Sequence, residues 1–177
     1  MKISKEISPP PLPTEEPWSI SKDDMYYLII AAIVVLDQMI KALASSGLDP
    51  AHSVTLIDGV LYLTYVENKG AAYNILSQYP ALLIILPAVL MTAGLIFLAG
   101  YRKKMKPMLL LSVSMIVGGG MGNLLDRIVR GYVVDFFNIR IIPVFNIADI
   151  FICAGAVLFC IYMIFFDKRG DERRKNL

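Results

Sequence analysis

The chain has 177 residues, of which 56% are hydrophobic and only 18% are charged, and its formal net charge is +2. Its mean hydropathy of +0.61 is well above what the surface of a water-soluble domain tolerates. This composition excludes a soluble globular enzyme or binding domain, and we expect a membrane protein.

The chain begins with 24 mostly polar residues that include the stretch SPPPLPTEEP. This segment is too rich in proline and charge to build a hydrophobic core, and it lacks the apolar stretch of a cleavable signal peptide. We predict a disordered N-terminal tail over residues 1–24. A proline-rich ligand for a partner protein is the alternative interpretation.

Four apolar stretches follow. Each is about 20 residues long, the length that crosses a hydrocarbon core of ~30 Å as a helix. We predict an all-α membrane protein with one transmembrane domain over residues 25–166 and a basic tail over residues 167–177. The predicted spans are Met25–Ala44, Pro80–Gly100, Pro107–Leu125 and Ala148–Phe166.

Lysine and arginine residues near the ends of the spans predict the orientation, because such residues are retained on the cytoplasmic side. The connection between the second and third spans and the tail after the fourth are both basic, so both termini should be cytoplasmic. The segments Ser45–Tyr79 and Asp126–Ile147 should then lie outside. The basic residues are Arg102, Lys103, Lys104 and Lys106 in the connection and Lys168, Arg169, Arg173, Arg174 and Lys175 in the tail.

The first external segment contains strand-forming residues. The stretch SVTLIDGVLYLTYV places two β-rich runs around Asp58-Gly59, a dipeptide that suits a tight hairpin turn. The later stretch GYVVDFF offers another short strand. We expect a small extracytoplasmic β-rich platform on the membrane surface.

Several kinds of chemistry are excluded by residues that are missing. His52 is the only histidine, so a histidine-based triad or an H-E-x-x-H zinc site cannot form, and we expect no metal. Cys153 and Cys160 are seven positions apart on one predicted helix, which is ~10 Å and too far for a disulfide. No phosphate-binding or dinucleotide-binding glycine motif occurs, and we expect no cofactor. The remaining candidates for catalytic groups are carboxylate side chains.

Charged residues in or beside the spans are costly, at least ~2.5 kcal/mol in the bilayer centre, and usually have a task. Asp37 and Lys41 are spaced i, i+4 on one helix face, where they can neutralise each other. Asn123, Asp126 and Arg127 share one face at the end of the third span in the same way. We interpret both groups as structural, with a direct role in chemistry as the alternative, and Arg127 is able to donate two hydrogen bonds to a carboxylate or to loop carbonyls.

Glycines precede this polar face. Gly118, Gly119, Gly120 and Gly122 would let another helix approach closely. Gly118 and Gly122 also match a G-x-x-x-G pattern, although one copy gives little support for a dimer, and we expect a monomer.

Asp135 and Asp149 have no obvious neutralising residue nearby in the sequence. Both are predicted at the outer interface, where the chain can fold back and bring them together. Two facing carboxylates in a poorly solvated place cannot both ionise easily, so one keeps its proton while the other stays charged. Such a pair can activate water and polarise a carbonyl for peptide hydrolysis. A proton- or cation-coupled transporter, whose acids bind the ion, is the alternative.

Four stretches in order, DQMIK, ENKGAAY, GGGMGNLLDRIVRGYVVDFF and FNIADIFICAG, resemble the characteristic blocks of lipoprotein signal peptidase, also called signal peptidase II. This family consists of aspartic proteases of the bacterial inner membrane. The resemblance extends from Asp37 to Gly155, although Tyr73 stands where phenylalanine is expected.

The resemblance implies a role for each matching residue. Asp135 and Asp149 match the catalytic aspartates. Other residues match family positions that support the active site or bind the substrate. These residues are Asn68, Asn123, Asp126, Arg127, Asn146, Asp37, Lys41 and Gly122.

The resemblance also implies the substrate class and the location. The substrates would be prolipoproteins, cut before a cysteine that carries a diacylglyceryl group. The protein would also contact membrane lipids, and we expect no nucleic acid partner. The protein would lie in the inner membrane with its active site near the outer face.

Overall fold

The computed structural model describes residues 24–70 and 76–166. The predicted N-terminal tail, apart from Asp24, and the predicted basic tail lie outside the described residues, as does Tyr73.

Four helices are each long and apolar enough to cross a membrane, which confirms the four predicted spans. Two of them extend past the predicted ends. The first continues beyond Ala44, where the Ser45 hydroxyl donates a hydrogen bond to the Lys41 carbonyl. The third continues beyond Leu125 and therefore contains Asp126 and Arg127, which the predicted helix face shared with Asn123 requires, although the predicted external segment began at Asp126. The helices are α1 (Met25–Gly47), α2 (Pro80–Tyr101), α3 (Pro107–Val129) and α4 (Ile147–Phe165), and the short 3₁₀ helix η2 (Arg102–Lys104) follows α2.

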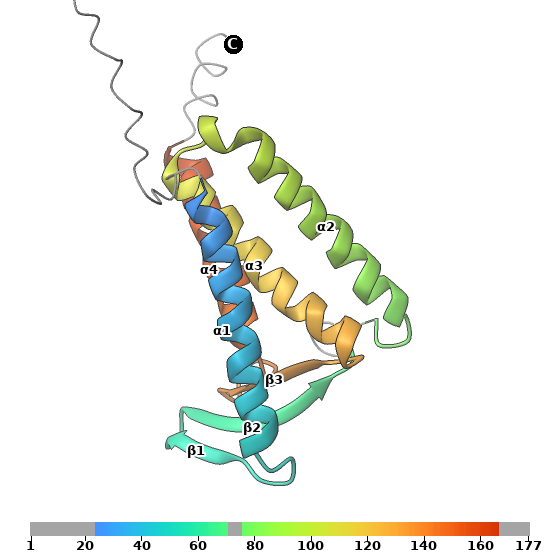
Figure 1. Cartoon of the computed structure of the whole chain (residues 1–177). Helices are drawn as coiled ribbons and strands as arrows, with labels where there is room; N and C mark the ends of the chain where they lie inside the picture. Colours follow the sequence, from blue (N-terminus) through green and yellow to red (C-terminus); the bar gives the residue numbers. More distant parts are fainter. Residues whose placement is uncertain (1–23, 71–75, 167–177) are drawn as a thin grey trace, which may run out of the picture.

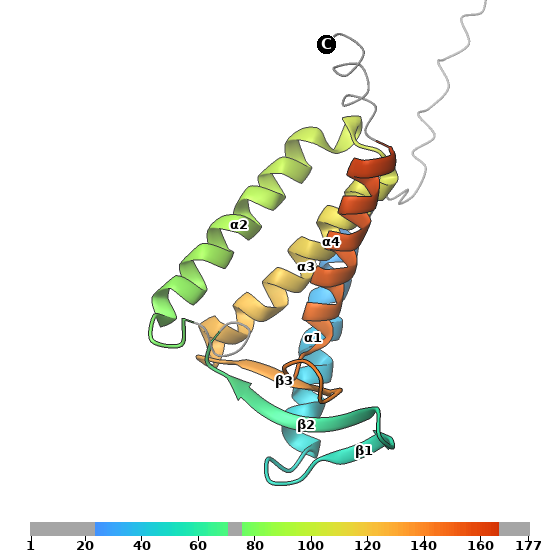
Figure 2. The ribbon, with the colours of Figure 1, turned by 180° about the vertical axis from the view of Figure 1, so that it is seen from behind.

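Helix α3 is the centre of the bundle and packs against α4, α1 and α2. In Figures 1 and 2, α2 lies at the edge of the bundle, beside α3. Glycines on α3 face all three neighbours. A methyl group at Gly119 would meet the Ala148 carbonyl oxygen of α4, and one at Gly122 would lie 2.5 Å from the Asp37 carboxylate of α1. Gly118 also faces α1, so the G-x-x-x-G pair serves packing within the chain.

The predicted β-rich platform is a three-stranded antiparallel sheet in the order β1 (Val54–Ile57), β2 (Leu61–Asn68) and β3 (Val133–Asn138). Gly59 forms the β1–β2 turn with φ of 73°. Because α1 and α3 end here and α2 and α4 begin here, the sheet lies at one end of the bundle (Figures 1 and 2). We call this end the sheet end and the opposite end, with η2, the loop end.

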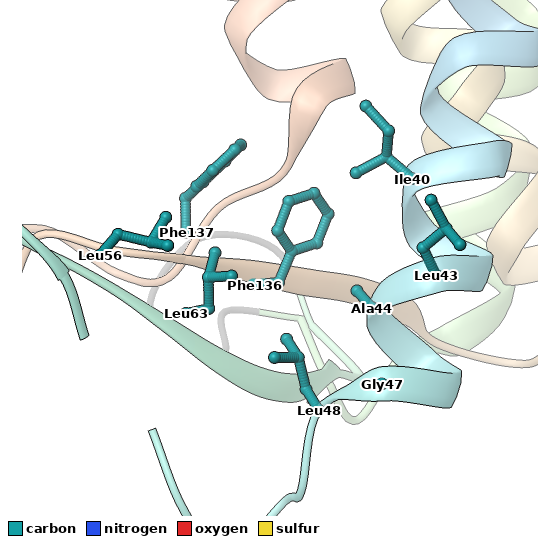
Figure 3. A pocket seen from close by; sticks show the side chains of 9 residues that line it. All are labelled: Ile40, Leu43, Ala44, Gly47, Leu48, Leu56, Leu63, Phe136 and Phe137. Atoms are coloured by element: carbon teal, nitrogen blue, oxygen red, sulfur yellow. The ribbon is translucent and has the colours of Figure 1, made fainter. Parts of the chain in front are cut away.

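The sheet is attached to the bundle by apolar contacts. Val134 and Phe136 of β3 are buried against Ala44 of α1. Beside these contacts an apolar pocket of about 330 Å³ opens between α1 and the sheet, and Figure 3 shows the Phe136 and Phe137 rings beside it. Its lining residues are Ile40, Leu43, Ala44, Gly47, Leu48, Leu56, Leu63, Phe136 and Phe137.

Candidate active site

The foundation of the site is a buried ion cluster between α1 and α3. The Lys41 ammonium lies 2.8 Å from Asp37 Oδ2 and 2.8 Å from Asp126 Oδ2, and all three side chains are fully buried. The pairing of Asp37 with Lys41 predicted from their i, i+4 spacing is confirmed, and Asp126 joins it from another helix. A buried cluster of this kind is strongly destabilised when one partner is removed, because the remaining charge is unpaired.

Further hydrogen-bond donors contact the carboxylates of these two acids. Ala148 N–H, in the first turn of α4, donates to Asp37 Oδ1 at 3.0 Å. Gln38 donates to Asp126 Oδ1 at 3.1 Å, and the Val134 N–H of β3 donates to Asp126 Oδ2 at 3.3 Å. The cluster therefore links α1 and α3 to the elements that carry Asp135 and Asp149. Gln38 stands in the DQMIK block, but its role was not predicted.

Asp135 lies on β3 beside this cluster and is only 2% exposed. Its carboxylate accepts hydrogen bonds from Asn68 Nδ2 at 2.8 Å and from Asn146 Nδ2 at 2.6 Å. Burial raises the pKa of Asp135 to about 6, the Asp149 charge acts in the same direction, and the two amide donors oppose the rise. The Asp135 carboxyl group therefore takes up a proton as the pH falls through about 6, close to neutral pH.

Asp149 lies in the first turn of α4 and is held differently. Its Oδ2 accepts from Asn146 N–H at 3.1 Å while its own N–H donates to Asn146 Oδ1 at 3.0 Å, which forms a capping box. Its Oδ1 accepts from Asn123 Nδ2 at 2.8 Å. These hydrogen bonds fix the position of the Asp149 carboxyl group at the start of α4.

Asn146 joins the two aspartates. Besides the capping bonds to Asp149, its Nδ2 donates to Asp135 Oδ1 and, at 3.0 Å, to Asn123 Oδ1. Asn123 in turn accepts from Lys41 Nζ at 2.9 Å. The side-chain oxygen of Asn123 thus faces two donors, so its nitrogen must point at Asp149.

Arg127 connects the site to the segment after β2. Its Nη2 donates to the Gly70 carbonyl at 3.0 Å and its Nη1 to the Asn123 carbonyl at 3.4 Å. Asn68 Oδ1 accepts from Gly70 N–H at 3.0 Å. Of the two kinds of partner predicted for Arg127, the loop carbonyl is the one found. The last three residues of the ENKGAAY block, 71–73, lie outside the described residues.

The other candidate groups lie apart from this site. Cys153 and Cys160 are exposed on α4, and His52 pairs with Asp49 at 2.8 Å on the exposed α1–β1 connection. Among residues 24–70 and 76–166, no group of three or more His, Cys, Asp or Glu side chains could hold a metal ion. Within the same residues, neither Asp135 nor Asp149 forms an ion pair with a basic side chain.

The two aspartates therefore differ in environment although one amide contacts both. Asp135 is buried and has a raised pKa, whereas Asp149 is held in the first turn of α4. Two carboxyl groups held in different environments by the same asparagine are suited to general acid–base catalysis on a peptide bond.

Comparison with known proteins identifies similar chains. Residues 29–165 match the family described as signal peptidase (SPase) II. A lipoprotein signal peptidase of Halothermothrix orenii is 40% identical over 147 residues, which is 83% of this chain and 100% of that protein. A lipoprotein signal peptidase of Clostridioides difficile is 39% identical over 148 residues, covering 82% of this chain and 99% of that protein.

Solved structures share the fold. One, described as a bacterial membrane enzyme determined by the in meso method, superposes with a TM-score of 0.72 at 27% identity and covers 83% of this chain and 90% of its own. Another with the same description gives a TM-score of 0.71 at 29% identity, covering 81% and 94%.

Proposed function

The chain belongs to the signal peptidase II family and is a membrane protease, and from this premise we propose that it removes signal peptides from prolipoproteins with Asp135 and Asp149 as the catalytic pair. The transporter alternative finds no support in the family match. The observation that carries the proposal is that one residue, Asn146, holds both carboxylates: its side-chain Nδ2 donates to Asp135 and its backbone N–H donates to Asp149.

The two aspartates take different roles in the proposed reaction. Asp149 removes a proton from a water molecule, and the resulting hydroxide attacks the scissile carbonyl carbon. Asp135, whose raised pKa favours its protonated form, donates a proton to the carbonyl oxygen. The gem-diol then collapses as the proton taken by Asp149 passes to the leaving amine and a gem-diol hydroxyl returns its proton to Asp135, so both carboxyl groups recover their starting states.

The remaining polar residues act as positioning groups. Asn146 and Asn123 hold the carboxylates, and the Asp37, Lys41 and Asp126 cluster holds Asn123 in turn. Gly122 lets Asp37 reach α3. Arg127 and Asn68 hold the backbone at Gly70 beside the pair, where the substrate would be covered.

The apolar pocket of Figure 3 supports a lipid-modified substrate. Its lining has no charged side chain, and it includes Phe136 and Phe137, which directly follow Asp135. We propose that one acyl chain of the diacylglyceryl group lies here, because each buried methylene contributes about 0.8 kcal/mol to anchoring. The anchored cysteine would hold the scissile bond at the depth of the aspartates.

The proposed orientation follows from charge. The basic residues Arg102–Lys104 of η2 lie at the loop end, so the loop end should face the cytoplasm and the aspartates the outer side. Both termini would then be cytoplasmic. We further propose that the enzyme acts in the bacterial inner membrane as a monomer, since the three neighbours facing the α3 glycines all belong to one chain.

Dyad substitutions test the proposal. Asp135→Asn and Asp149→Asn should each lower kcat on a diacylglyceryl-cysteine peptide by about 10²–10⁴-fold, because general acid–base catalysis contributes that much. Asp58→Asn is the matched control, since Asn-Gly also suits the β1–β2 turn. Activity of either dyad variant within about tenfold of wild type, ~1.4 kcal/mol in barrier, would remove that residue from the reaction.

The pocket has its own test. Gly47 lines it, and a side chain there meets nothing within 4 Å at its Cβ. Gly47→Phe should fill the pocket and raise KM for the lipidated peptide while leaving kcat nearly unchanged, whereas Gly47→Ala should change neither. Equal cleavage of lipidated and unlipidated peptides by the wild type would contradict the lipid requirement. Ion-driven substrate flux in liposomes, without cleavage, would restore the transporter.

A further inference from the structure

The loop end contains a second cavity, far along the bundle from Asp135. It has a volume of about 450 Å³ and lies where the start of α1, the α2–α3 connection and the start of α3 meet. Its walls are mostly apolar, with two basic side chains at the connection. The lining residues are Met25, Tyr26, Ile29, Arg102, Lys103, Met105, Pro107, Leu110 and Leu111.

Two hydrogen-bond donors at this cavity have no acceptor. Tyr26 is only 3% exposed, and its hydroxyl is unpartnered among the residues that the structure describes. The buried Nε of Arg102 is likewise unpartnered within them. Buried polar groups in native proteins nearly always have partners. Both residues line the cavity, so the acceptor oxygens of a ligand bound there could satisfy these two donors.

The charge around the cavity is positive. Arg102 and Lys103 line it, and Lys104 and Lys106 belong to the same connection. Arg102 Nη1 donates to the Ala99 carbonyl at 3.1 Å, and Asp24 lies 3.9 Å from its Nη2, too far for a hydrogen bond. These contacts leave the Nε free to bind an anion.

We propose that the cavity binds an anionic phospholipid. The phosphate accepts from the Tyr26 hydroxyl and the Arg102 Nε and is also attracted by Lys103, while one acyl chain lies along Ile29, Leu110 and Leu111. A lipid fits better than a soluble anion because most of the lining is apolar. The site is also at the end of three helices that can each cross a membrane, where headgroups meet the protein.

Lipid-dependent stability of the purified full-length protein tests this site. Thermal unfolding in detergent is measured with added phosphatidylglycerol, with phosphatidylcholine and with inorganic phosphate. The wild type should be stabilised by phosphatidylglycerol and much less by the other two. Tyr26→Phe removes only the hydroxyl, so it should bind phosphatidylglycerol about tenfold more weakly. In lipid-free detergent it should be at least as stable as the wild type, because an unpartnered buried group has been removed.

The matched control is Tyr101→Phe. Tyr101 is the last residue of α2, at the same end of the bundle, but is 54% exposed and does not line the cavity. This variant should respond to phosphatidylglycerol like the wild type. Loss of the response in Tyr101→Phe and not in Tyr26→Phe would overturn the assignment, as would an equal response to inorganic phosphate and phosphatidylglycerol, which would indicate a free-anion site.

A segment of the chain itself is the competing occupant. Residues 1–23 contain four acids, Glu6, Glu15, Glu16 and Asp23. If one of these acids filled the cavity, replacing all four by the corresponding amides would lower the unfolding temperature in lipid-free detergent, and Tyr26→Phe would lower it as well. That pair of results, with no preference for phosphatidylglycerol over phosphatidylcholine, would overturn the lipid proposal.

Discussion

The buried polar groups at the two ends of the bundle differ. At the sheet end, the buried acids and amides around Lys41 all make hydrogen bonds or ion pairs with described residues. The Arg130 Nη1 at this end has no hydrogen bond among them but lies 3.8 Å from Asp126 Oδ1. At the loop end, the Tyr26 hydroxyl and the Arg102 Nε have no hydrogen-bond partner among the described residues. The cluster around Lys41 is therefore preorganised by the chain itself, as catalysis requires, whereas we propose that a lipid supplies the acceptors at the loop end.

The largest effect is expected from breaking the ion cluster. Lys41→Met leaves Asp37 and Asp126 facing each other without a cation, which costs roughly 3–5 kcal/mol at a buried site. We expect a large fall in unfolding temperature in detergent and loss of activity. Lys104→Met, at an exposed basic position of the loop end, is the control and should be nearly neutral.

A second substitution separates charge from packing in this cluster. Adding Asp37→Asn to Lys41→Met removes one of the stranded charges and should recover part of the lost stability. If Lys41→Met alone unfolded at the wild-type temperature, the cluster would not be the foundation of the sheet end.

The next effect concerns the pH dependence of stability. The pKa of Asp135 is raised by burial from 3.8 to about 6. Between these values the folded protein holds a proton that the unfolded chain has released. Stability therefore falls as pH rises from about 4 to about 6, by at most about 3 kcal/mol, and does not recover at neutral pH.

Asp135→Asn checks this because an amide resembles the protonated carboxyl and does not titrate. Unfolding temperatures measured from pH 4 to pH 7 should decline more in the wild type than in the variant. Asp58→Asn should follow the wild-type curve. Parallel curves for wild type and Asp135→Asn would show that Asp135 has an ordinary pKa and would weaken its assignment as the proton donor.

The sequence predicted the helices well because hydropathy over about 20 residues is a local property. Helix ends were less accurate: α3 continues through Asp126 and Arg127, whose side chains are polar but whose backbones are helical. The Asp37–Lys41 pair was readable because i, i+4 neighbours meet on any helix.

Contacts between different helices and strands could not be predicted from hydropathy or from spacing along one helix. The approach of Asp126 to Lys41 depends on how closely α1 and α3 pack. The N-x-x-D spacing of Asn146 and Asp149 is typical of a helix start, but the contact of Asn146 with Asp135 requires β3 to return beside α4. Gln38 was missed for the same reason. The catalytic roles of Asp135 and Asp149 stay predictions until the variants are assayed.

A smaller effect is expected where α3 and α4 touch. A methyl group at Gly119 would meet the Ala148 carbonyl oxygen and lie 2.8 Å from Ile152 Cγ1. Gly119→Ala should therefore push α4 away and cost about 1–3 kcal/mol, as overpacking of a filled core does. Because Asp149 lies in the first turn of α4, kcat should fall as well. Normal stability and activity would show that the helices can separate here without affecting the site.

The smallest effect is expected at the loop end, and its sign should be opposite. Gly100 lies near the end of α2, and a methyl group there would meet nothing within 4 Å. Gly100→Ala should raise stability by about 0.4–1 kcal/mol, because alanine restricts the unfolded chain and favours the helix. Thermal unfolding in lipid-free detergent and with phosphatidylglycerol measures this gain. An equal gain in both conditions is expected, since Gly100 does not line the lipid cavity; a gain that disappears with lipid would place the bound lipid against α2 and require the proposed site to be extended to that helix.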